Sequence, residues 1–197
     1  MRLHDLTLSG NCYKVRLFAA LIGQPLTLKP VDFLGGEQRQ PAFLALNPFG
    51  QMPVLEDEGR VLRDSQAILV YLARKHGDPA WLPEDAGGLA EVMQWLSTAA
   101  NEVQHGPADA RLALKFGLPI DLAAAQATAA HVLGLLDAHL QRHDWLACGR
   151  PTVADCAVYP YCALAGEGGI DLAPYPALRA WFDRLRALPG YVSMPGL

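Results

Sequence analysis

The residues best suited to chemistry stand in one short polar segment near the start of the chain. Ser9-Gly10-Asn11-Cys12-Tyr13 joins an expected strand over Leu3–Leu8 to an expected helix over Val15–Ile22. A hydroxyl that donates a hydrogen bond to sulfur, beside the positive end of a helix dipole, favours the thiolate form of a thiol. Lowering a thiol pKa by ~2 units needs only ~2.7 kcal/mol, which one or two such contacts can supply. The segment is therefore suited to activating a small thiol, with Ser9 as the catalytic candidate.

Other roles are open to the residues of this turn. Ser9 can act simply as the N-cap of the following helix, a position that serine often fills. Cys12 can be a reactive thiol, because a helix start lowers a cysteine pKa, and it would then support disulfide reduction. A lone cysteine one turn into a helix is more often a small packing residue, which is the interpretation we favour. Asn11 is a further candidate for orienting a bound thiol.

A second polar centre lies between Asn47 and Ile68. The pattern predicts a strand, a tight turn, an antiparallel strand and a capped helix, at Met52–Leu55, Glu58-Gly59, Val61-Leu62 and Gln66–His76, with Asp64-Ser65 as the cap. Proline fits near the start of a strand only where no ladder N–H is needed. An unpaired strand edge at Pro53, next to a helix N-terminus, can hold the backbone and a carboxylate of a small peptide.

The elements around these two centres predict a thioredoxin-like order. The helix at Val15–Ile22 is followed by a strand over Pro25–Val31, and the tight links make the first two strands parallel neighbours. A short helix over Pro41–Leu46, with proline at its first position, precedes the hairpin. The N-terminal part is thus expected to be α/β with the order β-α-β-α-β-β-α, ending near Gly77.

Everything after a proline-containing linker reads as helical. Asp78–Glu84 holds two prolines, so we expect a domain over 1–77, a linker over 78–84 and an all-helical domain over 85–197. Three apolar stripes with helical spacing predict a bundle: Leu89, Val92, Met93, Leu96, Ala100 and Val103; Ala129, Val132, Leu133, Leu136 and Leu140; Leu178, Trp181, Phe182 and Leu185. Thr152 and Asp155 have the spacing of a capping box before a further helix.

Composition excludes several classes of function. A net charge of −4, with no block of lysine or arginine, argues against a nucleic-acid partner. The first residues do not form a signal peptide, and the longest uncharged segment, Leu122–Leu136, is too short to span a bilayer, so no membrane partner is expected. Cysteines 12, 148, 156 and 162 lack metal-binding spacing and are expected to be reduced thiols. We expect a soluble cytoplasmic protein without a metal.

These motifs together resemble the cytosolic glutathione S-transferases, in particular a bacterial branch with serine at the active turn. The resemblance covers nearly the whole chain and rests on four segments: Asn47-Pro48 with Pro53, Asp64-Ser65-Gln66-Ala67-Ile68, Thr152-x-x-Asp155, and Trp95 to Phe116. It implies that Pro53 is cis and that the backbone of Met52 pairs with the cysteinyl unit of glutathione. It further implies that Asp64 and Ser65 bind the γ-glutamyl end, while Gln51 and Arg39 are candidates for the glycyl carboxylate.

The same resemblance implies a function and a dimer. Ser9 would activate glutathione, as a co-substrate, for conjugation to a hydrophobic electrophile. The electrophile pocket would be walled by residues from a loop, the first helix and the helical domain: Tyr13, Leu34, Asn101, His105 and Phe116. A homodimer is expected, in which Phe49 either inserts into the partner or packs within its own chain. Two alternatives stay open: a glutathione-dependent disulfide or peroxide reductase using Cys12 in a mixed disulfide, and a non-catalytic interaction module.

Overall fold

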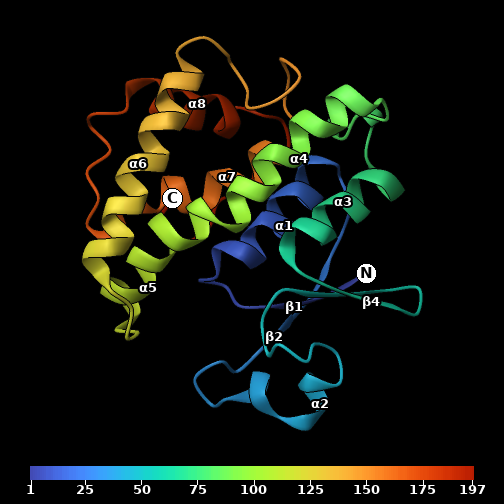
Figure 1. Cartoon of the computed structure of the whole chain (residues 1–197). Coiled ribbons are helices and arrows are strands. Elements are labelled where there is room, and N and C mark those ends of the chain that lie inside the picture. Colours follow the sequence, from blue (N-terminus) through green and yellow to red (C-terminus); the bar gives the residue numbers. More distant parts are fainter.

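A small sheet with helices forms the N-terminal part of the protein (Figure 1). The computed structural model describes all residues, 1–197. Its first elements are β1 (Arg2–Asp5), α1 (Gly10–Leu21), β2 (Thr27–Pro30), η1 (Glu37–Arg39), α2 (Pro41–Leu44), β3 (Val54–Asp57), β4 (Arg60–Arg63) and α3 (Ser65–His76). Apart from the added 3-10 turn η1, this is the predicted β-α-β-α-β-β-α order, and the thioredoxin-like fold is confirmed.

The sheet places the two polar centres at one edge. The strand order is β2-β1-β3-β4, with β1 parallel to β2 and antiparallel to β3. His4 lies opposite Val54, so the residues just before β3 lie beside the carboxyl end of β1. The chain leaves that end of β1 toward Ser9, and the Met52–Pro53 peptide bond directly before β3 is cis. The turn that carries Ser9 and the proline therefore meet at the same end of the sheet.

Polar caps determine where α1 and α3 begin. The Ser9 side chain accepts a hydrogen bond from the Cys12 N–H, so α1 starts at Gly10, five residues before the apolar run that indicated it. The Asp64 carboxylate accepts from the N–H groups of Gln66 and Ala67, at 2.9 and 3.0 Å, which starts α3 at Ser65. Both helix N-termini thus satisfy some of their free N–H groups with side chains.

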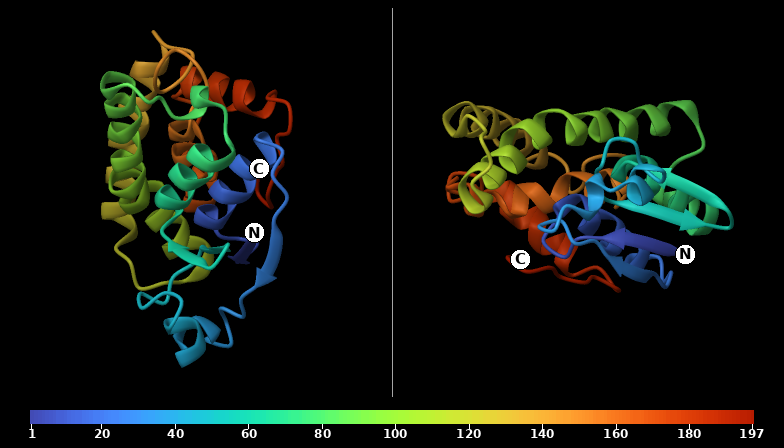
Figure 2. Two further views of the ribbon diagram at one scale, coloured as in Figure 1. Left: turned by 90° about the vertical axis from the view of Figure 1, so that its right-hand side faces the viewer. Right: turned by 90° about the horizontal axis from the view of Figure 1, so that it is seen from below.

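The second part of the protein is helical, as predicted. It contains η2 (Pro79–Trp81), α4 (Ala86–Ala100), the π-helix η3 (Gln104–Ala108), α5 (Asp109–Phe116), α6 (Leu122–Leu140), α7 (Val153–Ala163), η4 (Ala165–Gly168) and α8 (Pro176–Arg186). Figure 2 shows these helices stacked against the side of the sheet domain that carries α1 and α3. α7 is the central element: it packs against α1, α3, α4 and α8.

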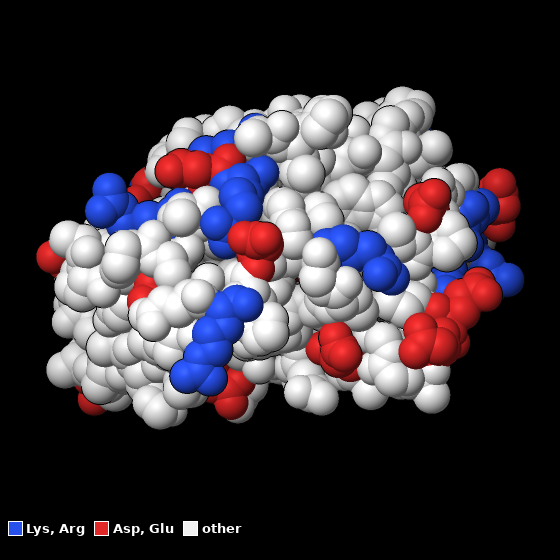
Figure 3. Space-filling view, turned by 90° about the horizontal axis from the view of Figure 1, so that it is seen from above, with Lys and Arg blue, Asp and Glu red and all other residues white.

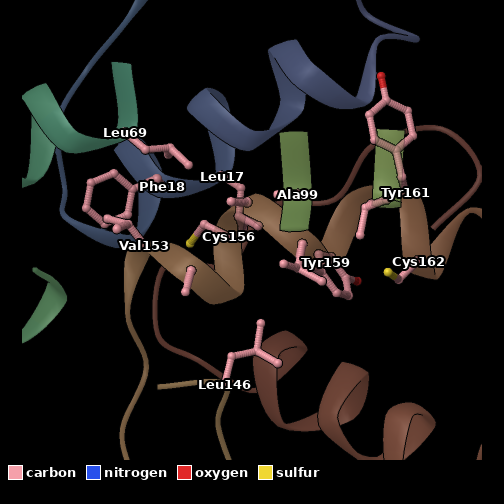
Figure 4. Packing of buried hydrophobic residues seen from close by; sticks show 14 of the residues in the cluster. Leu17, Phe18, Leu69, Ala99, Leu146, Val153, Cys156, Tyr159, Tyr161 and Cys162 are labelled. Carbon is pink, nitrogen blue, oxygen red and sulfur yellow. The ribbon is translucent and has the colours of Figure 1, made fainter. Parts of the chain in front are cut away.

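The core runs through both parts of the molecule along α7 (Figure 4). The predicted stripes of α6 and α8 are buried in full, including Trp181 and Leu133 at 0% exposure. The stripe predicted for α4 is wrong at two positions, since Met93 and Ala100 are exposed, whereas Ala99 is buried. α4 packs against α7, and a narrow face through Val92 and Ala99 suffices for that contact.

The predicted capping box at the start of α7 is confirmed. The Asp155 carboxylate is 1% exposed and accepts four hydrogen bonds. One oxygen accepts from the Thr152 N–H at 2.9 Å and the Thr152 hydroxyl at 3.2 Å. The other accepts from the Leu146 N–H at 3.2 Å and the Trp181 indole N–H at 2.9 Å. This one carboxylate therefore joins α7, the segment before it and α8.

Charges are mixed over the face of the molecule seen in Figure 3, where acidic and basic side chains alternate and neither sign forms a broad field. No helix combines the length and the apolar character that crossing a bilayer requires. No three histidine, cysteine, aspartate or glutamate side chains lie together in a way that could hold a metal ion.

Candidate active site

The Ser9 hydroxyl lies at the N-terminus of α1 and is partly exposed. Its oxygen accepts from the Cys12 N–H at 3.2 Å. A hydroxyl has one proton to donate in addition to its acceptor lone pairs, so this bond leaves the Ser9 proton available. The N-cap role and a thiol-activating role, which the sequence offered as alternatives, are therefore compatible in one side chain.

Asn11 links the active-site turn to the N-terminus of α3. The single Ser65 hydroxyl proton has two acceptors within reach, the Gln66 side-chain oxygen at 2.6 Å and the Asn11 side-chain oxygen at 3.4 Å. The Asn11 amide nitrogen donates in turn to the Gln104 side-chain oxygen at 3.4 Å. These contacts join Asn11, in the turn that also carries Ser9, to the start of α3 and to the π-helix. Sequence reasoning missed Gln104, for which no local signal exists.

Tyr161 of α7 is a second residue at the turn that the sequence did not indicate. Figure 4 shows its ring projecting from α7 toward α1, and its hydroxyl accepts from the Asn11 N–H at 3.3 Å. A Cβ atom on Gly10 would lie only 2.6 Å from this ring, so glycine is required there by the close approach. Burial raises the pKa of Tyr161 to about 12, while the Asn11 N–H and Ser9 act in the opposite direction. Tyr161 is thus a neutral hydroxyl beside Ser9.

Arg111 of α5 holds the turn from the other side. Its guanidinium donates to the Leu8 carbonyl at 2.9 Å and to Glu167 at 2.5 Å, and the residue is 1% exposed. Leu8 directly precedes Ser9, so the backbone at the catalytic candidate is fixed by a side chain from the helical part. An arginine in a short amphipathic helix gave no sequence signal for this role.

The structure decides the alternatives for Cys12 and corrects the expected place of Tyr13 in the first turn of α1. Cys12 is fully buried, and burial raises the pKa of its thiol to about 12, so it is the packing residue that we favoured and not the alternative low-pKa nucleophile. Tyr13 was expected in the electrophile pocket, but it is fully buried and its hydroxyl donates to the Val192 carbonyl at 2.7 Å. Because α1 begins at Gly10, both residues already face the protein interior.

The remaining glutathione candidates lie around the end of the sheet. Pro53 is buried, Met52 is half-buried against the small cluster that contains Val54, and Gln51 is exposed. The Gln51 carbonyl accepts from the Asn47 amide at 2.7 Å, which fixes the loop before Met52. Asp64 is exposed beside Ser65. Arg39 is exposed at the end of η1, and its side chain makes no hydrogen bond within the protein.

The other candidates for the electrophile wall are exposed. Leu34 is 98% exposed in the loop after β2, and Phe116 is 41% exposed at the end of α5. Asn101 caps the C-terminus of α4 and bonds to Glu102. These side chains are free to contact a ligand, unlike that of Tyr13.

His105, a candidate for the electrophile wall, lies in the π-helix. The chain passes through Pro107 without a break into α5, because a π turn accommodates the proline. His105 Nδ1 lies 3.0 Å from the Asp109 carboxylate, which also accepts from Gln104 at 3.3 Å. The histidine is therefore a hydrogen-bonded polar residue whose exposed ring faces solvent.

Comparisons with known proteins agree with this arrangement in both parts of the chain. Residues 3–80 match the family model described as glutathione S-transferase, N-terminal domain, and residues 118–189 match glutathione S-transferase, C-terminal domain. Glutathione S-transferase D7 of Anopheles gambiae is 33% identical over 93% of this chain and 85% of its own.

Solved structures give the same result. A glutathione S-transferase from Pseudomonas fluorescens is 35% identical, with a TM-score of 0.92 over 98% of both chains. The structure of a possible glutathione S-transferase from Rhodopseudomonas palustris is also 35% identical, with a TM-score of 0.90 over 98% of this chain and 97% of that one. The fold, the active-site turn with the adjoining cis-proline and the matches along both domains lead to one conclusion: this chain belongs to the glutathione S-transferase family.

Proposed function

We propose that this glutathione transferase activates its co-substrate through the Ser9 hydroxyl and conjugates the resulting thiolate to a hydrophobic electrophile. The observation that carries the proposal is the contact between the two polar centres, in which Asn11 joins the Ser9 turn to Ser65 at the start of α3. One centre suits a sulfur anion and the other suits the amino-acid end of a peptide. Cys12, buried and protonated, does not compete for the role.

The reaction requires only the thiolate and the electrophile. The Ser9 hydroxyl accepts a hydrogen bond from the Cys12 N–H and donates its own proton in a hydrogen bond to the glutathione sulfur, which lowers the pKa of the thiol. The thiolate attacks an electrophilic carbon and forms the carbon–sulfur bond. In a substitution the leaving group departs with its bonding electron pair; in an addition the carbanion takes a proton from water. The thiol proton leaves to solvent before the attack.

Glutathione would lie along the end of the sheet. The Met52 backbone pairs with the cysteinyl unit beside cis-Pro53, and Asp64 with Ser65 holds the γ-glutamyl end. Gln51 and Arg39, both exposed, are the proposed partners of the glycyl carboxylate. Leu34, Asn101, His105 and Phe116 form the proposed electrophile wall, where two apolar side chains and two polar ones match a hydrophobic substrate with a polar substituent.

We also propose a cytoplasmic homodimer, with a division between domains at the 78–84 linker. Phe49 is 63% exposed, so of its two alternatives, burial within its own chain is not observed. The Arg63 guanidinium lies 4.3 Å from the centroid of the Phe49 ring, which presents a large apolar surface to solvent. An exposed aromatic ring held in this way supports insertion into a partner subunit.

The proposal is tested first by binding and then by the pKa of the bound thiol. Reduced glutathione at about ten times its dissociation constant should stabilise the protein by roughly 1.4 kcal/mol and raise the melting temperature. Ultraviolet absorbance of the thiolate, followed against pH, then reports the pKa of bound glutathione. We expect a value well below the free thiol's in the wild type and a rise of about 1–2 units in Ser9→Ala, since each unit is about 1.4 kcal/mol.

Two further variants separate catalysis from helix capping. Ser9→Gly removes the hydroxyl but costs the cap only a few tenths of a kcal/mol, so it should lose activity while remaining nearly as stable as the wild type. Ser97→Ala removes an exposed hydroxyl that only bonds back to the Met93 carbonyl, and it should change neither property. An unchanged thiol pKa in Ser9→Gly would refute Ser9 as the activating group. Absence of glutathione binding by the wild type would favour the non-catalytic module.

A further inference from the structure

Lys14 is a buried cation for which the fold provides no hydrogen-bond partner. It lies one turn after Asn11 on α1 and is 0% exposed. Its ammonium nitrogen is buried and makes no hydrogen bond. Lysines are rarely buried in full unless they are paired, because an uncompensated charge in the interior is costly. The residue therefore needs an explanation that its contacts within the protein do not provide.

Lys14 lies against Tyr161, a residue that also contacts the turn carrying Ser9. The ammonium lies 5.5 Å from the centroid of the Tyr161 ring, the same ring that packs against Gly10 and accepts from the Asn11 N–H. α1 packs against both α7 and α3. Beside the Tyr161 ring, the titratable groups whose charge acts on the Lys14 ammonium are Asp64, the N-cap of α3, and Cys162 of α7. Lys14 thus shares the Tyr161 ring with the Ser9 turn, and its charge is felt by the group that caps α3.

The charges at this end of the site match a zwitterion. The γ-glutamyl unit of glutathione carries an ammonium and a carboxylate on one carbon. Asp64 is an exposed negative group that suits the ammonium. The carboxylate needs positive charge, which the N-terminus of α3 supplies only in part because Asp64 already caps the N–H groups of Gln66 and Ala67. Lys14 supplies a full positive charge in a poorly screened interior.

We propose that Lys14 is a positioning residue for the γ-glutamyl unit: its buried ammonium attracts the carboxylate of that unit to the start of α3 without touching it. The inference rests on the proposed function and adds a residue to it. Burial lowers the pKa of Lys14 to about 8, whereas Asp64 and Cys162 raise it. A bound carboxylate would act in the same direction as Asp64, raise the pKa of Lys14 above about 8 and so keep the lysine charged.

The first test compares Lys14→Met with the wild type. Methionine keeps the length and the apolar stem but removes the charge. Calorimetric titration with reduced glutathione should show binding weakened about tenfold, equivalent to about 1.4 kcal/mol. KM for glutathione should rise by a similar factor while KM for a chloronitrobenzene electrophile stays constant. Lys29→Met, at an exposed lysine on β2, is the matched control and should leave both constants unchanged.

Two readouts distinguish positioning from a structural role. Lys14→Met should be at least as stable to urea as the wild type, because an unpaired buried charge is replaced by an apolar group. S-Methylglutathione has no thiol proton, so any proton exchange on its binding comes from other groups. At pH 8, titrations in buffers of different ionisation enthalpy should show more proton uptake by the wild type than by Lys14→Met.

The outcomes separate the two proposals. If the wild type does not bind glutathione, the proposed function fails. If the wild type binds and Lys14→Met binds equally well, the function stands and the role of Lys14 is overturned. A marked loss of stability in Lys14→Met would also overturn it, because the lysine would then be a structural contact. Weaker binding with intact stability and less proton uptake supports the inference.

Discussion

Replacing Asp155 by alanine should remove a large part of the free energy of unfolding, although Asp155 lies outside the proposed active site. The carboxylate is 1% exposed and accepts from Thr152, Leu146 and Trp181. Alanine leaves three N–H donors without partners in a place that water does not reach. Each unpaired buried donor costs about 1–3 kcal/mol, and removing the buried charge returns part of that cost. We expect a loss of about 4 kcal/mol, a large fraction of the 5–15 kcal/mol typical of a folded domain.

Asparagine provides an internal calibration of this magnitude. Its side-chain oxygen can still accept from Leu146 and Trp181, while its NH₂ group faces the Thr152 N–H and meets donor with donor. One bond to the Thr152 backbone is lost, and no charge is buried. Asp155→Asn should therefore cost about 1–3 kcal/mol, less than Asp155→Ala.

Urea unfolding, followed by tryptophan fluorescence, measures both losses. With a slope of about 2 kcal/mol per molar, Asp155→Ala should lower the midpoint by about 2 M. Asp121→Ala is the control, because Asp121 is an exposed N-cap of α6 whose removal should cost only about 1 kcal/mol. A loss for Asp155→Ala no greater than that for Asp121→Ala would refute the reasoning, since burial of the unpaired donors would then have no cost.

Four further predictions follow from other features of the structure. Burial raises the pKa of Asp155 from 3.8 to about 6, so between about pH 4 and pH 6 the carboxyl group binds a proton more readily in the folded state than in the unfolded state. As pH rises from about 4 to about 6, the stability of the wild type relative to Asp155→Asn should therefore fall, which urea midpoints measure. Cys12→Ala should retain conjugation within about threefold, and native Cys12 should resist alkylation; loss of turnover in the folded variant would revive the reductase alternative. Phe49→Ala should weaken self-association by at least about tenfold in sedimentation experiments, whereas Phe116→Ala should not; equal association of both variants would contradict the proposed contact. Arg111→Met should lower the free energy of unfolding in urea by about 3 kcal/mol, because it leaves the Leu8 carbonyl without a donor and removes the buried ion pair with Glu167. Lys115→Met removes a more exposed ion pair with the same Glu167 and should cost less than 1 kcal/mol.

Features governed by neighbours in the chain could be predicted from the sequence. The caps at Ser9, Asp64 and Thr152 each involve residues at most three positions away, and side-chain caps of this kind follow from residue type. The parallel pairing of β1 with β2 followed from the tight links around the helix between them, and the antiparallel pairing of β3 with β4 from the turn at Glu58-Gly59. The cis bond before Pro53 followed from the resemblance to the family, not from the residues alone. The boundary at the linker stays a prediction.

Features that depend on distant residues could not be predicted in this way. Tyr161 bonds to Asn11 across 150 positions, Arg111 to Leu8 across 103 and Asn11 to Gln104 across 93. No periodicity or motif carries such pairings. The misplacement of Tyr13 has a local cause: the apolar run suggested a helix from Val15, but the Ser9 cap starts it at Gly10, and the helical phase then turns Tyr13 inward.

Arg111 and Tyr161, both from the helical domain, contact the Ser9 turn of the sheet domain. These contacts affect what happens when one domain is exchanged for that of a relative. A chimaera that keeps the sheet domain and takes its helical domain from a relative would exchange more than Asn101, His105 and Phe116 of the proposed electrophile wall. It would also replace the tyrosine behind Gly10 and the arginine that grips Leu8. Such a hybrid should therefore change the acidity of glutathione along with the choice of electrophile, so substrate preference and nucleophile strength are inherited together.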